Sequence, residues 1–167
     1  MQHVNFIIII LSAFIPMIIG AIWYSPKVLG TIWMKESGVT QEQINSGGML
    51  KIFGFSILFS LFLSMSLQFM VIHQFHLNSI IMSEVDYTNP GSDSQTWLTE
   101  TMANYGNNYR TFKHGLFHGI LVGLFFAFPL IGINSLFERR SFKYIFIHSA
   151  YWIISFGLMG GVICAFT

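Results

Sequence analysis

The sequence predicts an all-α membrane protein whose four transmembrane helices form an up-down bundle. Of the 167 residues, only 9% are charged and 53% are hydrophobic, and the mean hydropathy is +0.62. Because about a quarter of the residues in a soluble domain are charged, this chain could not cover its surface with polar groups in water. Four apolar stretches reach the roughly 20 residues that cross a bilayer, and they lack the alternation of barrel strands. We therefore expect a single transmembrane domain over residues 1–167.

Four continuous apolar segments define the predicted helices, which span residues 4–24, 49–75, 111–137 and 142–166. The first contains no charged residue and has no Lys or Arg ahead of it, so we expect a retained helix and not a cleaved signal peptide. Pro16 and Pro129 lie inside the first and third helices and predict simple bends there, since each proline frees a backbone carbonyl.

Three connections join these helices. The first holds the short polar stretch "ESGVTQEQINSGG", and the third is a tight turn at "ERRS". The second is a long outer loop over residues 77–109, with turn-forming clusters such as "NPGS". Because this loop retains Tyr87, Trp97 and Tyr105, we expect a partly ordered cap.

The distribution of basic residues predicts the orientation in the membrane. Six of them flank the two short connections, namely Lys27, Lys35, Lys51, Arg139, Arg140 and Lys143. Only Arg110 and Lys113 flank the long loop, which also carries four acids. Since Lys and Arg concentrate in cytoplasmic loops, we expect both termini and the long loop outside the cytoplasm.

Rows of small residues at spacing four run along each predicted helix and indicate close helix packing. The third helix carries a doubled G-x-x-x-G. The residues that we expect to pack the helices are Gly20, Ser60, Gly115, Gly119, Gly123, Gly157 and Gly161. Packing within the bundle is the favoured interpretation, and a contact between protomers through one row is the alternative.

Histidines gather on the predicted outer side. His73 and His76 end the second helix, and His114 and His118, at i and i+4, begin the third. His3 precedes the first helix on that side. Imidazoles in this arrangement can hold zinc or copper, and histidines from two helices can ligate a haem. The alternative is a set of amphipathic interface residues, because no H-E-x-x-H or C-x-x-C signature accompanies them.

Little else in the sequence indicates chemistry. No G-x-S-x-G, P-loop or G-x-G-x-x-G is present, so we predict no enzyme, and no other cofactor is indicated. Asn5, Gln68 and Asn134 are interpreted as hydrogen-bonding residues between helices, and Cys164 as a buried small hydrophobe. The net charge of +1 provides no basic patch for a nucleic acid.

The stretch "GAIWYSPKVLGTIWMKE" follows the first helix. Trp23, Tyr24 and Trp33 are predicted to anchor the chain at the cytoplasmic interface, where amphipathic rings concentrate. Pro26 stops the helix from continuing, and "VLGTIWM" is too short to span the bilayer. We therefore interpret this stretch as a membrane exit and surface anchor.

This stretch, together with "GLFHGILVGL" and "LFERRSFKYIFIHSAYWIISFGLMGG", resembles a bacterial family of small integral membrane proteins known as domain of unknown function 1761. The first part of the pattern is matched by Gly20, Trp23, Tyr24, Ser25, Pro26, Gly30 and Trp33. The later parts are matched more loosely by Gly119, Gly123, Phe137, Glu138, Tyr151 and Gly160. The resemblance implies four helices in a bacterial cytoplasmic membrane, but it implies no activity.

Three functional hypotheses follow. The first is a structural protein that assembles in the lipid bilayer, with itself or with a partner membrane protein, through its glycine rows and outer loop. The alternative is a carrier of a small solute or ion, with a path beside the histidines and Asn134. The third is a subunit that binds a metal or haem at its outer face through the histidines.

Overall fold

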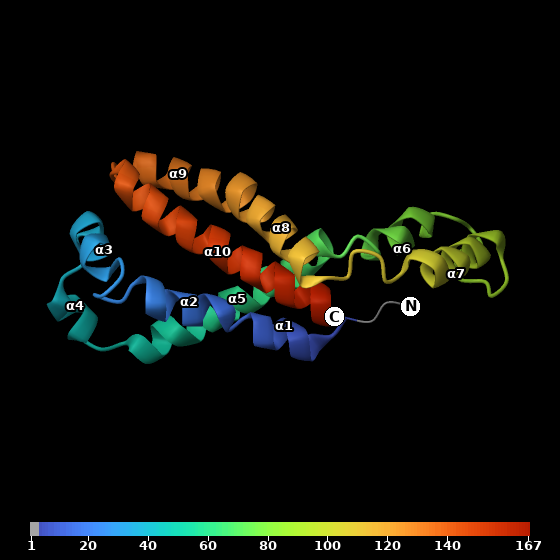
Figure 1. The fold of residues 1–167 in the computed structure, drawn as a ribbon, viewed down its shortest axis with the longest axis horizontal. Coiled ribbons are helices and arrows are strands. Elements are labelled where there is room, and N and C mark those ends of the chain that lie inside the picture. Colours follow the sequence, from blue (N-terminus) through green and yellow to red (C-terminus); the bar gives the residue numbers. More distant parts are fainter. Residues whose placement is uncertain (1–3) are drawn as a thin grey trace.

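The computed structural model describes residues 4–167, and these residues form helices and no strands (Figure 1). The prediction of four membrane-spanning helices is confirmed. The helices in chain order are α1 (Phe6–Ser12), α2 (Ile15–Trp23), α3 (Gly30–Ser37), α4 (Gln41–Asn45), α5 (Met49–Val71), α6 (Phe75–Ile81), α7 (Asp93–Tyr105), α8 (Phe112–Val122), the π-helical turn η1 (Gly123–Ala127), α9 (Phe128–Phe137) and α10 (Phe142–Phe166). The first span comprises α1 and α2, and the third comprises α8, η1 and α9.

Both prolines coincide with a departure from the regular α-helix. Pro16 is near the start of α2, directly after the break between α1 and α2. Pro129 is near the start of α9, directly after η1. Because a proline has no N–H to bond the carbonyl four residues earlier, one helical backbone hydrogen bond is missing in the preceding turn. The first and third spans are therefore interrupted where the sequence predicts a bend.

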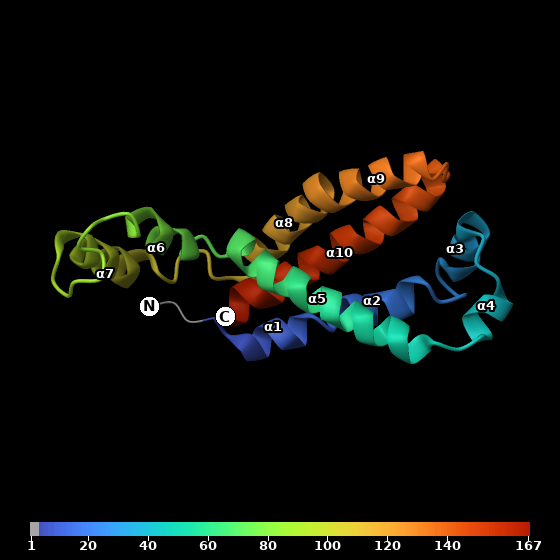
Figure 2. The same cartoon turned by 180° about the vertical axis from the view of Figure 1, so that it is seen from behind.

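Helix α10 is the centre of the bundle. Half of the most apolar 18-residue stretch of α10 is buried, whereas the corresponding stretches of the other three spans are 11–22% buried. In Figures 1 and 2, α10 lies between α8 and α9 on one side and α1, α2 and α5 on the other. The contact with α8 is the closest, since a Cβ added to Gly119 would lie 2.1 Å from the carbonyl oxygen of Phe156.

The predicted packing residues lie at contacts within the chain. Gly115 and Gly123 also lie against the backbone of α10. Gly157 faces Leu116 and Ile120, and Gly161 faces the ring of Phe112. Gly20 is in ordinary contact with the ring of Tyr151, and Ser60 is buried on α5. The close approach of α8 to α10 therefore uses the doubled G-x-x-x-G within one molecule.

A buried polar contact joins α1 to α5. The Ser64 hydroxyl donates to the carbonyl oxygen of Ile9 at 2.9 Å, and the Ser12 hydroxyl donates to the same oxygen at 2.9 Å. The two hydroxyls also contact each other. Each hydroxyl donates its single proton to this shared carbonyl oxygen, and such short side chains let the two helices approach closely in an apolar environment.

The predicted outer loop contains two helices. Residues 75–105, with α6 and α7, form a lobe that extends beyond one end of the bundle (Figure 1). The second span ends at Val71 and not near Phe75 as predicted. Its continuation is interrupted at Ile72, which is extended, and the buried Gln74 side chain donates to the carbonyl oxygen of Asn108 at 2.7 Å. This contact, at the base of the lobe, lies where hydropathy alone predicts that the helix continues.

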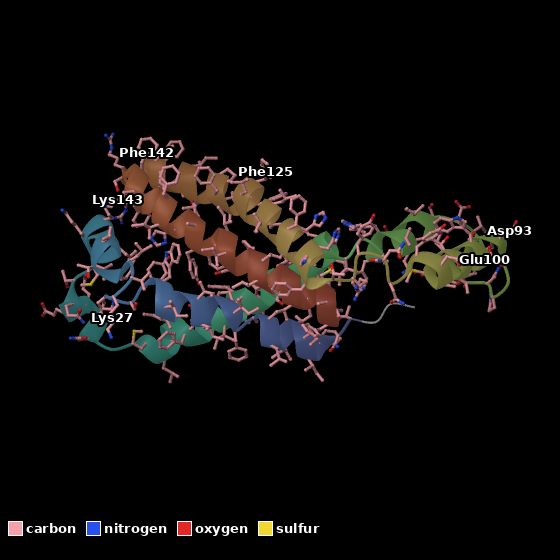
Figure 3. The ribbon with its side chains drawn as sticks, viewed as in Figure 1. Lys27, Asp93, Glu100, Phe125, Phe142 and Lys143 are labelled. Atoms are coloured by element: carbon pink, nitrogen blue, oxygen red, sulfur yellow. The ribbon has the colours of Figure 1, made fainter. Side chains whose placement is uncertain are left out.

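The two ends of the bundle differ in charge. Lys27 and Lys143 lie at the end formed by α3, α4 and the α9–α10 turn, which we call the basic end (Figure 3). Asp93 and Glu100 lie in the lobe at the other end, which we call the lobe end (Figure 3). The start of α1 and the last turn of α10 also lie at the lobe end (Figure 1).

Candidate functional site

Three of the predicted histidines meet at the lobe end of the bundle. His73 lies in the turn between α5 and α6, whereas His114 and His118 lie one helical turn apart on α8. The Thr111 hydroxyl accepts a hydrogen bond from the His114 backbone N–H and caps α8 just before the two histidines. Because α5 ends at Val71 and α8 begins after Thr111, the three imidazoles lie together at the lobe end of the bundle.

The ring nitrogens converge on one point. The Nε2 atom of His73 lies 3.1 Å from that of His114 and 3.3 Å from that of His118. One nitrogen from each ring lies within 4.8 Å of the other two. His73 is exposed, and the other two side chains are half-buried, so the cluster is accessible from outside the bundle.

This geometry suits a metal better than hydrogen bonding alone. An imidazole nitrogen carries either one proton or one lone pair, so Nε2 of His73 can make one well-directed hydrogen bond but has two close neighbours. Two nitrogens bound tetrahedrally to Zn²⁺ at 2.0–2.1 Å lie about 3.3–3.4 Å apart. The separations of 3.1 and 3.3 Å between the histidine nitrogens are close to that value.

The other candidate ligands lie outside this cluster. His76 is exposed in the first turn of α6, after the break that follows α5. Among residues 4–167, no carboxylate joins the three histidines, and Asp86 of the lobe accepts a hydrogen bond from Ser94. His3 lies outside the described residues. The cluster is therefore composed of imidazoles, which suit Zn, Cu, Fe and Ni.

Aromatic rings surround the three histidines. The ring of Tyr109 lies 5.1 Å from that of His114, and Phe117 packs edge-on against His118 at 5.5 Å. Tyr109 has a left-handed backbone with φ of 60°, which is uncommon for a residue with a side chain. Its carbonyl oxygen accepts from the Cys164 thiol at 3.4 Å, so the thiol is engaged away from the ring nitrogens.

A second polar cluster lies at the basic end and joins the "WYSP" stretch to α10. The Tyr24 hydroxyl lies 3.1 Å from Nδ1 of His148, and the Trp23 indole donates to the carbonyl oxygen of Ile147 at 3.1 Å. The Tyr151 hydroxyl donates to the carbonyl oxygen of Pro16 at 2.9 Å. The location of these rings at the cytoplasmic interface stays a prediction, and the structure adds that they fasten α2 to α10.

The turn after Tyr24 fits this cluster closely. Gly30 donates to the carbonyl oxygen of Ser25 at 2.8 Å, and a Cβ at Gly30 would lie 2.3 Å from the carbonyl oxygen of Tyr24. Only glycine fits there. The ring of Trp33 then packs 5.2 Å from that of Tyr24. Burial raises the pKa of the Tyr24 phenol well above its ordinary value, and the neighbouring Tyr151 and Tyr144 raise it further.

The pairing of Tyr24 with His148 is a feature that sequence reasoning missed. The two residues are separated by 124 positions, and no local spacing connects them. The available signal was weak: His148 lies next to Tyr151, and both Tyr24 and Tyr151 match the pattern of the resembled family. A polar ring at the start of an apolar helix is by itself too common to indicate a partner.

The comparisons with known proteins agree with the resemblance. A family model described as "Protein of unknown function (DUF1761)" matches residues 7–164, which is nearly the whole chain. No curated protein and no solved structure matches the chain. The chain therefore belongs to the DUF1761 family of proteins of unknown function.

Proposed function

We propose that this integral membrane protein binds one transition-metal ion, Zn²⁺ or a copper ion, through His73, His114 and His118. The observation that carries the proposal is the convergence of three Nε2 atoms, two pairs of which are separated by 3.1 and 3.3 Å. Such a site leaves the fourth tetrahedral position for water or an exogenous ligand. The proposal concerns binding, and no reaction is assigned to the site.

The arrangement favours a single ion over a haem. The three imidazole rings are in mutual contact, with centroids 4.4 to 5.1 Å apart. A porphyrin held between two axial histidines would have to separate the rings. A small ion between the nitrogens needs only minor adjustments.

The proposed orientation places this site outside the cytoplasm of a bacterial cell. The basic end carries Lys27 and Lys143, and the lobe carries Asp93 and Glu100 (Figure 3). Positive residues concentrate on the cytoplasmic side, and both termini would then lie outside. The acidic lobe beside the histidines also favours the approach of cations from that side.

Metal titration of matched variants tests the proposal. The protein is purified with a tag that contains no histidine, stripped with a chelator, and titrated with Zn²⁺ and with Cu²⁺. We expect one bound ion in the wild type and in His76→Ala, the control from the same segment. His73→Ala should weaken binding by more than about 100-fold, because loss of a residue that only orients a metal-bound histidine already costs about 10–100-fold. Equal affinity in His73→Ala and His76→Ala would contradict the proposal.

Assembly with a partner is a second candidate function, favoured by the lobe. Its surface exposes large apolar side chains at Ile80, Met82, Val85, Trp97 and Tyr105. Because the G-x-x-x-G row is occupied within the bundle, we propose that any assembly uses the lobe. A wild type that sediments as an oligomer in detergent, and becomes monomeric in Val85→Asp, would support it. A monomeric wild type in native lipid would contradict self-assembly.

A further inference from the structure

The lobe of residues 75–105 is a body of its own beside the bundle. Ile81 of α6 and Leu98 of α7 are buried, and neither is a member of the buried cluster that forms the core of the bundle. Within residues 4–167, α6 and α7 pack against each other, and neither makes an extensive contact with a bundle helix. Two chain segments carry the lobe, a first connection of residues 72–74 and a second connection of residues 106–111 (Figures 1 and 2). These two connections therefore determine where the lobe lies.

The base of the lobe has an apolar anchor and a cavity beside it. Phe75, at the start of α6, packs against the apolar core of the bundle. The same residue lines a cavity of about 540 Å³ between the lobe and the end of α10, whose lining also includes Met102 of α7 and Ala165 of α10. One apolar anchor beside a cavity of this size can act as a pivot, and it leaves the direction of the lobe to the polar contacts of the two connections.

The first connection passes through the histidine cluster. His73 is its middle residue, and the Nε2 atom of His73 lies 3.1 and 3.3 Å from those of the two α8 histidines. The next residue, the buried Gln74, donates to the carbonyl oxygen of Asn108 at 2.7 Å and to that of Tyr105, the last residue of α7, at 3.4 Å. A shift of the backbone at His73 would therefore move the contact that holds the end of α7.

The second connection touches the same cluster. The ring of Tyr109 packs on that of His114, with ring centroids 5.1 Å apart and planes inclined by 32°. The left-handed backbone of Tyr109 is a conformation that persists in a non-glycine residue only where the surroundings hold it. Those surroundings include the His114 ring and the Cys164 thiol, which donates to the Tyr109 carbonyl oxygen at 3.4 Å. The orientation of the His114 ring therefore affects the second connection, as the position of His73 affects the first.

A metal ion would favour this arrangement of the connections over others. Three imidazoles reach one ion only while the first connection lies beside α8, so a lobe position that withdraws His73 leaves the ion with two of the three ligands. Loss of one ligand weakens binding by more than about 100-fold, and a ligand shifts a conformational equilibrium by the ratio of its affinities for the two states. A bound ion therefore shifts the lobe toward the position in the structure by the same factor.

We propose that the ion bound at the three histidines is a clamp that fixes the lobe on the bundle, and that the lobe pivots about Phe75 when the ion leaves. This inference rests on the proposed metal site and adds a regulatory role to it. The apolar side chains exposed on the lobe, such as that of Val85, are then presented in one fixed direction only in the metal-bound protein.

Distances between spin labels test the clamp. One pair of labels, at Val85→Cys and Phe125→Cys, joins the lobe to the bundle, and a control pair, at Ile18→Cys and Phe125→Cys, lies within the bundle; all three positions are exposed. A Cys164→Ser background removes the native thiol and keeps a hydroxyl donor at that buried position. Each protein carries a tag without histidine and is measured in nanodiscs by pulsed electron double resonance, first after chelation and then with one equivalent of diamagnetic Zn²⁺. Zinc binding is titrated in the same samples.

We expect zinc to narrow the distribution of distances between the lobe and the bundle at least about twofold, and to leave that of the control pair unchanged. Gln74→Leu keeps all three histidines but lacks the contact with Asn108. It should therefore bind zinc within about tenfold of the wild-type affinity, while zinc narrows its lobe-to-bundle distribution less. Amide hydrogen exchange of residues 105–111 in the unlabelled protein is an independent measurement, and zinc should slow this exchange at least about fivefold.

The two proposals fail in different ways. Bound zinc that leaves the lobe-to-bundle distances or the amide exchange of residues 105–111 unchanged would overturn the clamp, while the metal site would stand. Absence of zinc binding in the titration would contradict the metal site itself, and the clamp with it.

Discussion

The contact between α8 and α10 makes a sharp prediction about Gly119. A Cβ at this position would lie 2.1 Å from the carbonyl oxygen of Phe156 and 2.9 Å from Cα of Gly157, whereas ordinary contacts begin near 3.4 Å. Both atoms belong to the backbone, so no side chain can rotate to relieve the clash. Gly119→Ala must therefore move the two helices apart by about 1 Å locally, and such overpacking costs about 1–3 kcal/mol.

Gly132→Ala is the matched control on the same span. A Cβ there would meet only Ile145 at 3.9 Å, so the variant keeps the helix-propensity gain of alanine without the clash. Thermal unfolding in the same detergent should place Gly119→Ala below Gly132→Ala by about 2–12 °C, since the cost is about 1–3 kcal/mol and 1 kcal/mol shifts Tm by about 2–4 °C for a chain of this size. Equal transitions for the two variants would refute close backbone packing at this glycine.

Three further variants probe contacts that tie the chain together. Tyr151→Phe loses the hydrogen bond to the carbonyl oxygen of Pro16, and we expect a loss of about 1 kcal/mol in detergent unfolding. Gln74→Leu removes the donor to Asn108 and should speed amide hydrogen exchange in α7 while leaving α10 protected; unchanged exchange in the lobe would contradict that role. Tyr24→Phe tests pH dependence: the raised pKa keeps this phenol neutral in the folded protein above pH 10, where the unfolded chain ionises, so wild-type stability should fall above pH 10 more steeply than that of the variant. Parallel pH profiles of Tm would contradict this last prediction.

The spans could be predicted from the sequence because bilayer thickness sets helix length. Hydropathy placed the fourth helix at the observed residues 142–166. It could not predict that the second span ends at Val71, because the contact of Gln74 with Asn108 depends on the tertiary arrangement of the lobe. Nor could it identify α10 as the central helix, since every span is apolar and only packing distinguishes them.

The candidate site was predictable in part. The i, i+4 spacing placed His114 and His118 on one face, and topology placed His73 at the same end. Topology does not give the direction of a side chain after a helix break, so His76 could not be separated from His73 by position alone. The pairing of Tyr24 with His148 depends on the crossing of α2 and α10, and no periodicity reports it.

X-ray absorption at the zinc edge tests the proposed metal centre most directly. The wild-type protein, purified without a histidine tag and loaded with one equivalent of Zn²⁺, should show three imidazole ligands at 2.0–2.1 Å and one oxygen ligand. His73→Ala, loaded in the same way, should lose at least one imidazole contribution, and His76→Ala should retain all three. A wild-type spectrum dominated by oxygen ligands, or one that is unchanged in His73→Ala, would contradict a centre built from His73, His114 and His118.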